Sequence, residues 1–555
     1  MAGLSGEPAT GRLRLDRETR YALGALTAAG LLVMAFIFET QIRHRAPLAW
    51  DEAARGYAGL QLSRALSHHS ARDVIDWVNA QTFYPAMASA PGGIVLFLGA
   101  SVTASAWVPT LCFLVIGGFA VAFLGRALGL SPTASVGSAL VLWTTPVVCK
   151  IAAGGFTETL GICVEVAVLI GLVVLVNKPS IRTAILTGAA IGVATTVKYD
   201  YGLLCLATAG IAEVARVLTQ RNRRAAVTAA VTLGTAFVLS GAQFAFNSTA
   251  KIAGASDLIS STSGSAAKRY ARAFTSGKAG DFGYYLRALF GNGELGLNKL
   301  VAATMVLGVG VAVWRALRDP RWRVPLVFLA LWWVMYSLAR SKWPRYTATA
   351  LPVFSVASAL AVVSLCAAFA NDARRRAVAA VVAGVAVIAF ATQASNAATP
   401  FGFVAPDPPI EATLKFLRSN LRPSDGPLLF IGPSNELSPQ LVRLTWDRAT
   451  HRENGSVELV QEVPPQDRAD TFAATLSRLT PQQVLVVSFT RGARIDTLDT
   501  RTTFRSQPTF VRMADGLVKS GRYVVASHLT TDRGRIEVRL LRPAQNADSV
   551  TVGAS

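Results

Sequence analysis

The chain has 555 residues, a formal net charge of +21 and 52% hydrophobic residues, and only 16% of its residues are charged. An ordinary soluble domain has roughly a quarter of its residues charged, so this composition argues against a purely soluble, disordered or fibrous protein. A mean hydropathy of +0.41 indicates apolar spans that a soluble core does not hold. We therefore expect a polytopic membrane protein.

The 54 basic residues outnumber the 33 acidic ones, and a location in a membrane explains this excess. In a membrane protein they mark cytoplasmic loops and contacts with lipid phosphates, so membrane lipid, and no nucleic acid, is the expected partner. The five cysteines all lie in apolar stretches, which predicts neither a disulfide framework nor a cysteine metal site.

The apolar runs predict about eleven transmembrane helices, because about 20 apolar residues cross a ~30 Å hydrocarbon layer. The first run follows a charged N-terminal tail and is interpreted as an anchor that is not removed. The stretch 91–106 is interpreted as a re-entrant or juxtamembrane helix, because a crossing there would move every later basic loop to the other side. The expected spans are 21–39, 107–125, 135–150, 158–177, 183–197, 202–217, 225–246, 298–315, 324–339, 351–370 and 377–397.

The basic clusters between these spans then all face one side, which the positive-inside rule makes the cytoplasm. The composition suggests a bacterium, so we expect a plasma membrane protein with a cytoplasmic N-terminus. The opposite side receives the loops 40–106 and 247–297 and the polar tail. This organisation predicts a membrane domain over 1–400 and an extracytoplasmic domain over 401–555.

The tail predicts a small α/β domain, because short β-rich runs alternate with amphipathic helical patterns. The expected strands are 428–431, 484–488, 523–527 and 536–541, and the expected helices are 410–421 and 468–478.

Acidic residues stand at two outer span ends, although a charge at the centre of a membrane helix costs about 2.5 to 3.5 kcal/mol on insertion scales. Asp51 and Glu52 follow Trp50 just beyond the first span, and Glu158 begins a later one. Each group is either a candidate catalytic carboxylate or a helix N-terminal cap. A further acid, Glu165, lies two turns deeper in the same span as Glu158.

Basic residues stand at two other outer turns. Lys198 lies where an apolar hairpin reverses, and it is either a site residue or a snorkelling lysine paired with Asp200. The segment 340–346 places Arg340, Lys342 and Arg345 beside Trp343 and Tyr346 in an outer loop, which departs from the positive-inside pattern. These cations suit a lipid-linked phosphate, although the same residue types also anchor helices at headgroup level.

Together these groups place acids and cations from four distant segments on one face of the membrane. A carboxylate there can take the proton from an acceptor hydroxyl, and cations stabilise charge on a departing phosphate. Because nucleotide sugars are absent outside the cytoplasm, the expected donor is a polyprenyl-phosphate sugar.

The motifs resemble the GT-C glycosyltransferases, in the branch that contains protein O-mannosyltransferases and the lipid A aminoarabinose transferase. The resemblance covers roughly residues 20–370. Its motifs are an Asp-Glu pair (Asp51-Glu52), a Tyr-Pro (Tyr84-Pro85) and an acid at the start of a span (Glu158). They continue with a Gly-x-x-x-Thr-x-Lys-Tyr pattern (Gly192 to Tyr199) and a Lys/Arg-Tyr (Arg345-Tyr346) before a Leu-Pro (Leu351-Pro352). The aminoarabinose transferases have Lys-Pro-Pro before the juxtamembrane helix, whereas this chain has Tyr84-Pro85-Ala86.

The resemblance implies roles for these residues. The first-loop acid of the family acts as catalytic base or positions the acceptor, which implies Asp51, with Glu52 in support and Glu158 as a further catalytic acid. The basic loop of the family lies near the carrier phosphate, which implies Arg340, Lys342 and Arg345, with Lys198 in addition. The expected substrate contacts are Tyr84, Tyr199, Trp343 and Tyr346. Some relatives bind a divalent metal at the acidic cluster, and Asp51 with Glu158 could do so here.

The expected fold is a GT-C-like membrane domain followed by the α/β domain. The expected reaction is an inverting transfer of a sugar from a polyprenyl-phosphate donor to an acceptor hydroxyl of an envelope glycan, glycolipid or protein. A lipid or glycan transporter (flippase) and a non-catalytic envelope assembly factor remain alternatives. The loop 247–297, with Lys268, Arg269, Arg272, Tyr284 and Tyr285, either closes over a substrate or merely connects two spans.

Overall fold

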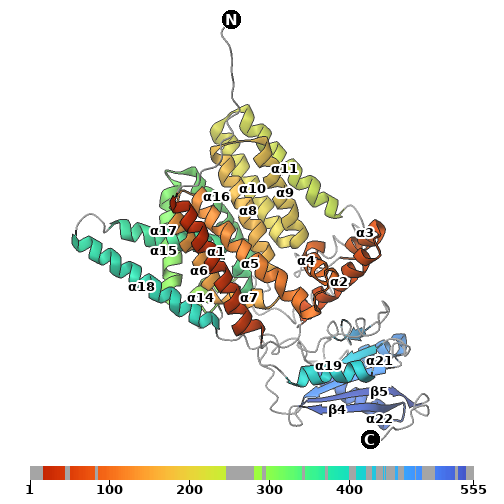
Figure 1. Cartoon of the computed structure of the whole chain (residues 1–555). Helices are drawn as coiled ribbons and strands as arrows, with labels where there is room; N and C mark the ends of the chain where they lie inside the picture. Colours follow the sequence, from red (N-terminus) through yellow and green to blue (C-terminus); the bar gives the residue numbers. More distant parts are fainter. Residues whose placement is uncertain are drawn as a thin grey trace.

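The structure is a computed structural model with a large helical body and a small α/β unit. The α/β unit lies at one end of the helical body (Figure 1). The described residues are 17–43, 50–81, 85–244, 280–290, 295–339, 344–368, 373–398, 408–420, 428–432, 442, 444, 457–459, 468–479, 481, 483–489, 507–531 and 536–544.

Ten of the expected spans each correspond to one helix of the body, and the expected span 135–150 corresponds to the pair α6 and α7. The helices are α1 (Arg17–Ile37), η1 (Phe38–Ile42), α2 (Trp50–Ser67), α3 (Ala71–Ala80), η2 (Ala86–Ala88), α4 (Ala90–Phe97), α5 (Val102–Ala127), α6 (Pro132–Thr144), α7 (Pro146–Ala153), α8 (Glu158–Asn177), α9 (Ile181–Val197), α10 (Tyr199–Gln220), α11 (Arg223–Phe244), α14 (Tyr284–Phe290), α15 (Lys299–Ala316), η3 (Pro320–Trp322), α16 (Arg323–Leu338), η4 (Pro344–Thr349), α17 (Leu351–Ala368) and α18 (Ala373–Ala398).

Within the described residues, 7 helices are long and apolar enough to cross a membrane, or up to 8 if a bent pair forms one span. The chain is therefore a multi-pass membrane protein, while the number of eleven crossings stays a prediction. The bent pair is α6 and α7, which meet at 62°. The bend lies at Thr145, which is extended because the following Pro146 disfavours the helical conformation before it.

The stretch 91–106 does not form a crossing of its own. Helix α4 has 8 residues, which at 1.5 Å per residue span about 12 Å and fall short of a ~30 Å layer. Helix α5 then begins afresh at Val102, where the side chain of Ser101 accepts a hydrogen bond from the Ala104 amide. This agrees with the expected juxtamembrane helix.

The described part of the tail forms one mixed sheet in the order β2-β1-β3-β5-β4. Its strands are β1 (Leu428–Ile431), β2 (Val457–Leu459), β3 (Gln483–Phe489), β4 (Tyr523–Thr531) and β5 (Ile536–Pro543), and its helices are α19 (Pro408–Asn420), α21 (Arg468–Leu479) and α22 (Gln507–Lys519). The expected α/β class, strands and helices are confirmed. The sequence pattern missed β2, which has 3 residues, and α22.

Candidate functional site

Charged side chains from three distant parts of the helical body meet at one cluster. Glu158 begins α8, Lys198 lies in the turn between α9 and α10, and Arg345 belongs to η4. The Glu158 Oε1 atom lies 3.9 Å from Lys198 Nζ and 3.7 Å from Arg345 Nε. One carboxylate therefore pairs with two cations that are 147 positions apart in the sequence (345 − 198).

The pairing of Glu158 argues against a simple capping role. Thr157 is the N-cap residue of α8, and its side chain makes no capping hydrogen bond. Glu158 is 2% exposed, and its Oε2 atom has no hydrogen-bond partner among the described residues. Burying a carboxylate is costly unless it is paired, and the two ion pairs with Lys198 and Arg345 offset this cost.

Lys198 is buried rather than directed into water. It is 7% exposed, and its Nζ lies 3.4 Å from Asp200 Oδ2 and within 5 Å of the ring centroids of Tyr201 (4.9 Å) and Tyr346 (4.7 Å). Burial disfavours the charged ammonium, but Asp200, Tyr346 and Glu158 together hold the pKa of Lys198 above its ordinary value. The predicted pairing with Asp200 is present, but as part of a buried cluster and not as a snorkelling contact.

A second arginine extends this cation cluster across one aromatic ring. The guanidinium carbons of Arg345 and Arg55 lie 5.0 Å and 5.5 Å from the ring centroid of Phe156. Arg55 is 8% exposed, and its Nη2 donates a 2.8 Å hydrogen bond to the Gly155 carbonyl. The sequence analysis missed Arg55, although it lies one helical turn after Asp51 in α2 and so on the same face.

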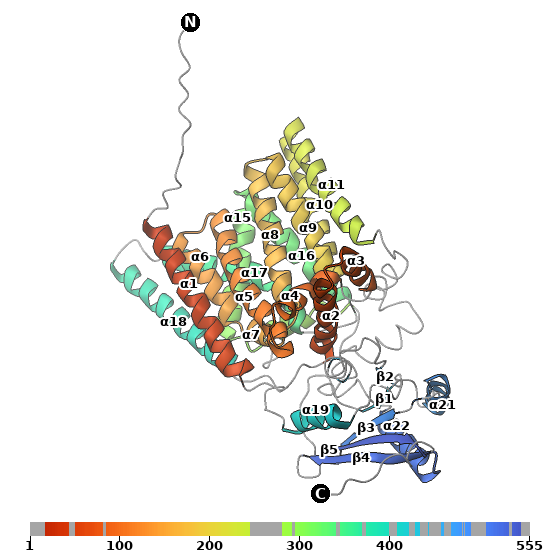
Figure 2. The same ribbon diagram turned by 45° about the vertical axis from the view of Figure 1, so that its right-hand side comes forward.

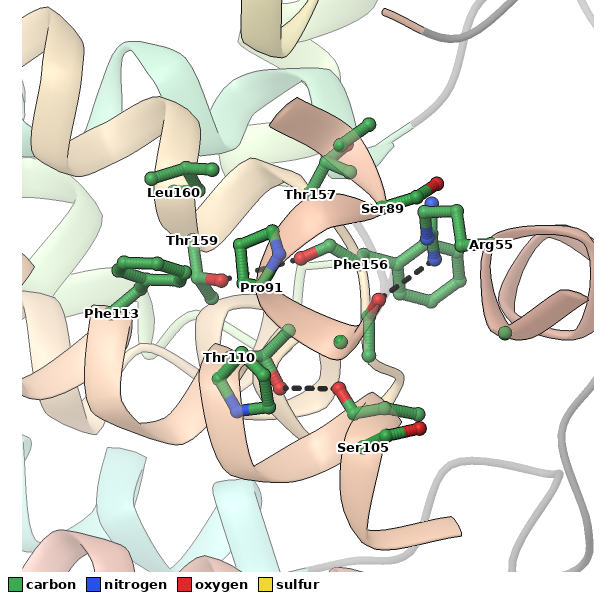
Figure 3. Close-up of a pocket in the computed structure, with 16 residues that line it drawn as sticks. Arg55, Ser89, Pro91, Ser105, Thr110, Phe113, Phe156, Thr157, Thr159 and Leu160 are labelled. Atoms are coloured by element: carbon green, nitrogen blue, oxygen red, sulfur yellow. Dashed lines mark hydrogen bonds between the residues drawn. The ribbon is translucent and has the colours of Figure 1, made fainter. Parts of the chain in front are cut away.

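Arg55 also borders a pocket between α2, α4, α5 and the start of α8. Figure 3 shows Arg55 and Phe156 on one side of this pocket and Phe113, Thr159 and Leu160 on the other. The lining combines hydroxyl groups with apolar side chains: Ser89, Ser105, Thr110, Thr157 and Thr159, with Pro91, Pro109, Phe113, Phe156 and Leu160. Such a lining suits a ligand with both a polar head and an apolar part.

An aromatic layer supports the cluster from α14 and α16. Tyr336 stacks on Tyr346 with ring centroids 5.2 Å apart, and it also contacts Tyr285 at 6.4 Å. Tyr285 in turn lies 5.1 Å from the ring of Trp332 and is 1% exposed. Thus the end of the loop 247–297 packs beside the cluster through Tyr285, whereas Lys268, Arg269 and Arg272 lie outside the described residues.

Glu165 lies deeper in α8. It is 1% exposed, and neither carboxylate oxygen has a hydrogen-bond partner among the described residues. It interacts electrostatically with Asp200, Lys198 and Glu158, so it belongs to the inner side of the same cluster.

The structure brings four predicted site residues together, namely Glu158, Lys198, Arg345 and Tyr346. Tyr199 instead forms a hydrogen bond with Gln243 of α11. Asp51 and Glu52 lie in the first turn of α2, but their side chains are not among those described. The remaining predicted residues lie outside the described residues: Tyr84, Arg340, Lys342 and Trp343.

The described residues do not form a metal site. Among them, no three His, Cys, Asp or Glu side chains are grouped as a metal ion requires. Glu158 Oε1 faces two cations, which take the place of further oxygen ligands. We therefore derive no step through a metal, and a divalent ion held by Asp51 and Glu158 stays a prediction.

No protein-family model and no curated protein matches the chain. Solved structures match its fold over nearly all of its length. ArnT from Cupriavidus metallidurans, bound to undecaprenyl phosphate, is 16% identical with a TM-score of 0.57, covering 93% of this chain and 97% of ArnT. The oligosaccharyltransferase AglB from Archaeoglobus fulgidus, in complex with an inhibitory peptide and a dolichol-phosphate, is 11% identical with a TM-score of 0.55, covering 96% of this chain and 75% of AglB.

The arabinofuranosyltransferase AftD from Mycobacteria is 15% identical with a TM-score of 0.52, and the match covers 96% of this chain and 40% of AftD. ArnT, AglB and AftD are all GT-C fold glycosyltransferases. At these identities the likeness shows the fold, and the expected GT-C fold is confirmed.

Proposed function

We propose that the GT-C fold of this chain serves a membrane glycosyltransferase, which moves a sugar from a polyprenyl-phosphate donor to an acceptor hydroxyl. The observation that carries the proposal is the cluster of Arg345 with the buried Arg55 and Lys198, which the fold assembles beside the pocket. Support comes from the similar structures of ArnT and AglB, which hold undecaprenyl phosphate and dolichol-phosphate.

The cation cluster has the composition of a phosphate site. Arg55 and Arg345 offer planar guanidinium groups that can bind phosphate oxygens bidentately, and Lys198 adds a point charge. Arg340 and Lys342 belong to the same segment as Arg345 and are proposed to complete the site. Glu158 neutralises Lys198 and Arg345 in this structure, so its contacts favour a role in positioning these two cations.

The proposed reaction needs one base and no redox partner. Asp51, supported by Glu52, takes the proton from the acceptor hydroxyl, and the acceptor oxygen forms a bond with the anomeric carbon. The bond from that carbon to the phosphate oxygen breaks, and its electron pair stays on the polyprenyl phosphate. The phosphate leaves against the cations, and the anomeric configuration is inverted.

The sugar would lie where hydroxyl groups and aromatic rings adjoin the cations. Ser89, Ser105 and Thr157 line the pocket next to Arg55 and can hydrogen-bond sugar hydroxyls. Tyr346 borders the cluster, and Tyr84 and Trp343 are proposed to join it as substrate contacts. The hydrogen bond between Tyr199 and Gln243 favours helix packing as the role of Tyr199.

We propose that the reaction takes place on the extracytoplasmic side of a bacterial plasma membrane. The basic loops all fall on one side of the expected spans, which favours a cytoplasmic N-terminus. The site and the C-terminal domain then lie outside, where an envelope glycan, a glycolipid or a secreted protein can supply the acceptor hydroxyl.

Native mass spectrometry of the purified protein and its Asp51→Asn variant tests the proposal. We expect a co-purifying polyprenyl-phosphate sugar, enriched in the variant because a protein without its base retains donor that it cannot use. The matched control is Asp76→Asn, an acid of the same outer segment that is paired with Arg72 at 3.8 Å and largely exposed. If neither protein retains polyprenyl phosphate, even when it is added, while other lipids stay bound, the transferase proposal fails and a transporter becomes the better explanation.

A further inference from the structure

The C-terminal sheet buries both of its faces, but it covers them with different parts of the chain. Alternate residues of the central strands, such as Leu429, Val484 and Leu541, pack under α21 and α22. The residues between them, such as Phe430, Leu485 and Leu540, form a second apolar layer on the opposite face. Because side chains alternate along a strand, each face needs its own cover.

The cover of the second face comes partly from the membrane domain. The cluster contains Phe416 and Leu417 of α19 and also Val442 and Leu444, which lie between β1 and β2 in the sequence. Four side chains packed against this cluster belong to α2 and α5: Tyr57, Leu60, Val102 and Ala106. Figure 2 shows the sheet below the helical body, on the side of α2. The hydrophobic layer of the C-terminal domain is thus completed by the helix that carries Asp51 and Arg55.

This layer continues to the pocket through a short chain of contacts. Ala106 lines the pocket as well as the apolar layer. Gly155 has a φ of +65°, and a Cβ there would lie 3.3 Å from the Ala106 carbonyl oxygen. Gly155 is also the residue whose carbonyl accepts the Arg55 hydrogen bond. Ala106 and Gly155 therefore link the second apolar layer to the cation cluster.

On its other side α2 is held at van der Waals distance by α4. A Cβ on Gly93 would lie 2.9 Å from the Gly59 carbonyl oxygen and 2.8 Å from Leu62 Cδ2. Helix α2 therefore packs against α4 on one side and against the second apolar layer of the C-terminal domain on another. If its packing against that layer is lost, α2 is supported by α4 alone.

We propose that the C-terminal domain positions the donor site, by packing its second apolar layer against α2 and α5 and so holding Arg55 and the turn at Gly155 in place. Leu60 is then a positioning residue, because it packs against this layer and does not line the pocket. The inference rests on the proposed function for its activity readout, whereas its structural readout is independent of any substrate.

The test compares Leu60→Ala with Leu66→Ala in the full-length protein. Both leucines are half-buried in α2, but Leu66 packs with Trp77 and Ala86 instead of the second apolar layer. Hydrogen exchange is measured at residues 154–156, whose amides donate to the carbonyls of residues 150–152 and are therefore protected in the wild type. We expect severalfold faster exchange at this turn in Leu60→Ala alone, with recovery in the volume-conserving Leu60→Met.

Turnover with a polyprenyl-phosphate sugar is measured on the same proteins. We expect Leu60→Ala to lower kcat/KM for the donor by about tenfold or more, because misplacing Arg55 weakens both the binding and the orientation of the donor phosphate. Unchanged exchange at residues 154–156 in Leu60→Ala, or equal changes in Leu66→Ala, overturns the positioning role. A wild-type protein without transferase activity overturns the proposed function instead, and the exchange data still decide the positioning role.

Discussion

The hydroxyl of Tyr336 donates a 2.8 Å hydrogen bond to Oδ2 of Asp200 and thereby ties α16 to the turn between α9 and α10. The same Asp200 oxygen lies 3.4 Å from Lys198 Nζ, and the Tyr336 ring stacks on Tyr346. Tyr346 is the sequence neighbour of Arg345. One tyrosine therefore supports both cations that pair with Glu158.

The variant Tyr336→Phe removes this hydrogen bond and keeps the aromatic stack. Without this donor a buried oxygen of Asp200 loses a hydrogen bond, which costs about 1 to 3 kcal/mol. Asp200 is then no longer oriented by Tyr336 towards Lys198. We expect the donor KM to rise severalfold in steady-state assays. Thr304→Val is the control, because Thr304 and Ser358 form a similar hydroxyl contact of 2.7 Å between α15 and α17. Equal donor KM values in the two variants would count against a role for Tyr336 in the site.

The two acids of α8 should respond differently to removal of their charge. Glu158→Gln leaves Lys198 and Arg345 without their shared counter-charge, so we expect turnover to fall by about 10²-fold or more. Glu165→Gln replaces a buried carboxylate, which has no hydrogen-bond partner among the described residues, by a neutral isostere, and we expect near-wild-type turnover and an unchanged or higher melting temperature. A proton-coupled transporter would instead require Glu165, so loss of function in Glu165→Gln alone would favour that alternative.

Arg345→Lys keeps the charge but loses the planar group beside Phe156. We expect weaker retention of undecaprenyl phosphate, by about tenfold, measured by native mass spectrometry in a titration of the lipid. The control is Arg321→Lys, since Arg321 forms a 2.7 Å pair with Asp319 in a loop that belongs to a basic cluster of the expected cytoplasmic side. Similar retention by both variants would remove Arg345 from the proposed phosphate site.

Two glycines of α15 provide a matched test of the helix packing. A Cβ at Gly308 would overlap the backbone carbonyl of Ala357 in α17, whereas no neighbouring atom of the described part of the chain lies within 4 Å of a Cβ at Gly310. Overpacking costs about 1 to 3 kcal/mol or more, because α17 has to move away. We expect Gly308→Ala to lower the melting temperature in detergent and Gly310→Ala to leave it unchanged. A pair of equal melting temperatures would show that α15 and α17 are not packed in this way.

Several parts of the site could be predicted because they are local patterns. The acid at the start of α8, Lys198 at a hairpin turn and Arg345 in a basic outer segment each break a local rule of hydropathy or charge. Arg55 breaks no such rule, because it lies in a polar outer segment where an arginine is unremarkable in composition. Tyr336 was likewise not assigned to the cluster, since an aromatic residue in an apolar span is ordinary.

Hydropathy and charge by themselves determined that the chain is a multi-pass membrane protein with an α/β tail, because both signals are repeated over many residues of one segment. Only the tertiary structure decided the pairing of Glu158 with Lys198 and Arg345, the support from Tyr336 and the packing of Leu60 against the second apolar layer of the C-terminal domain. Each of these contacts joins residues that are distant in sequence. Their meeting depends on how the helices pack and where α6 and α7 bend, which no single segment encodes.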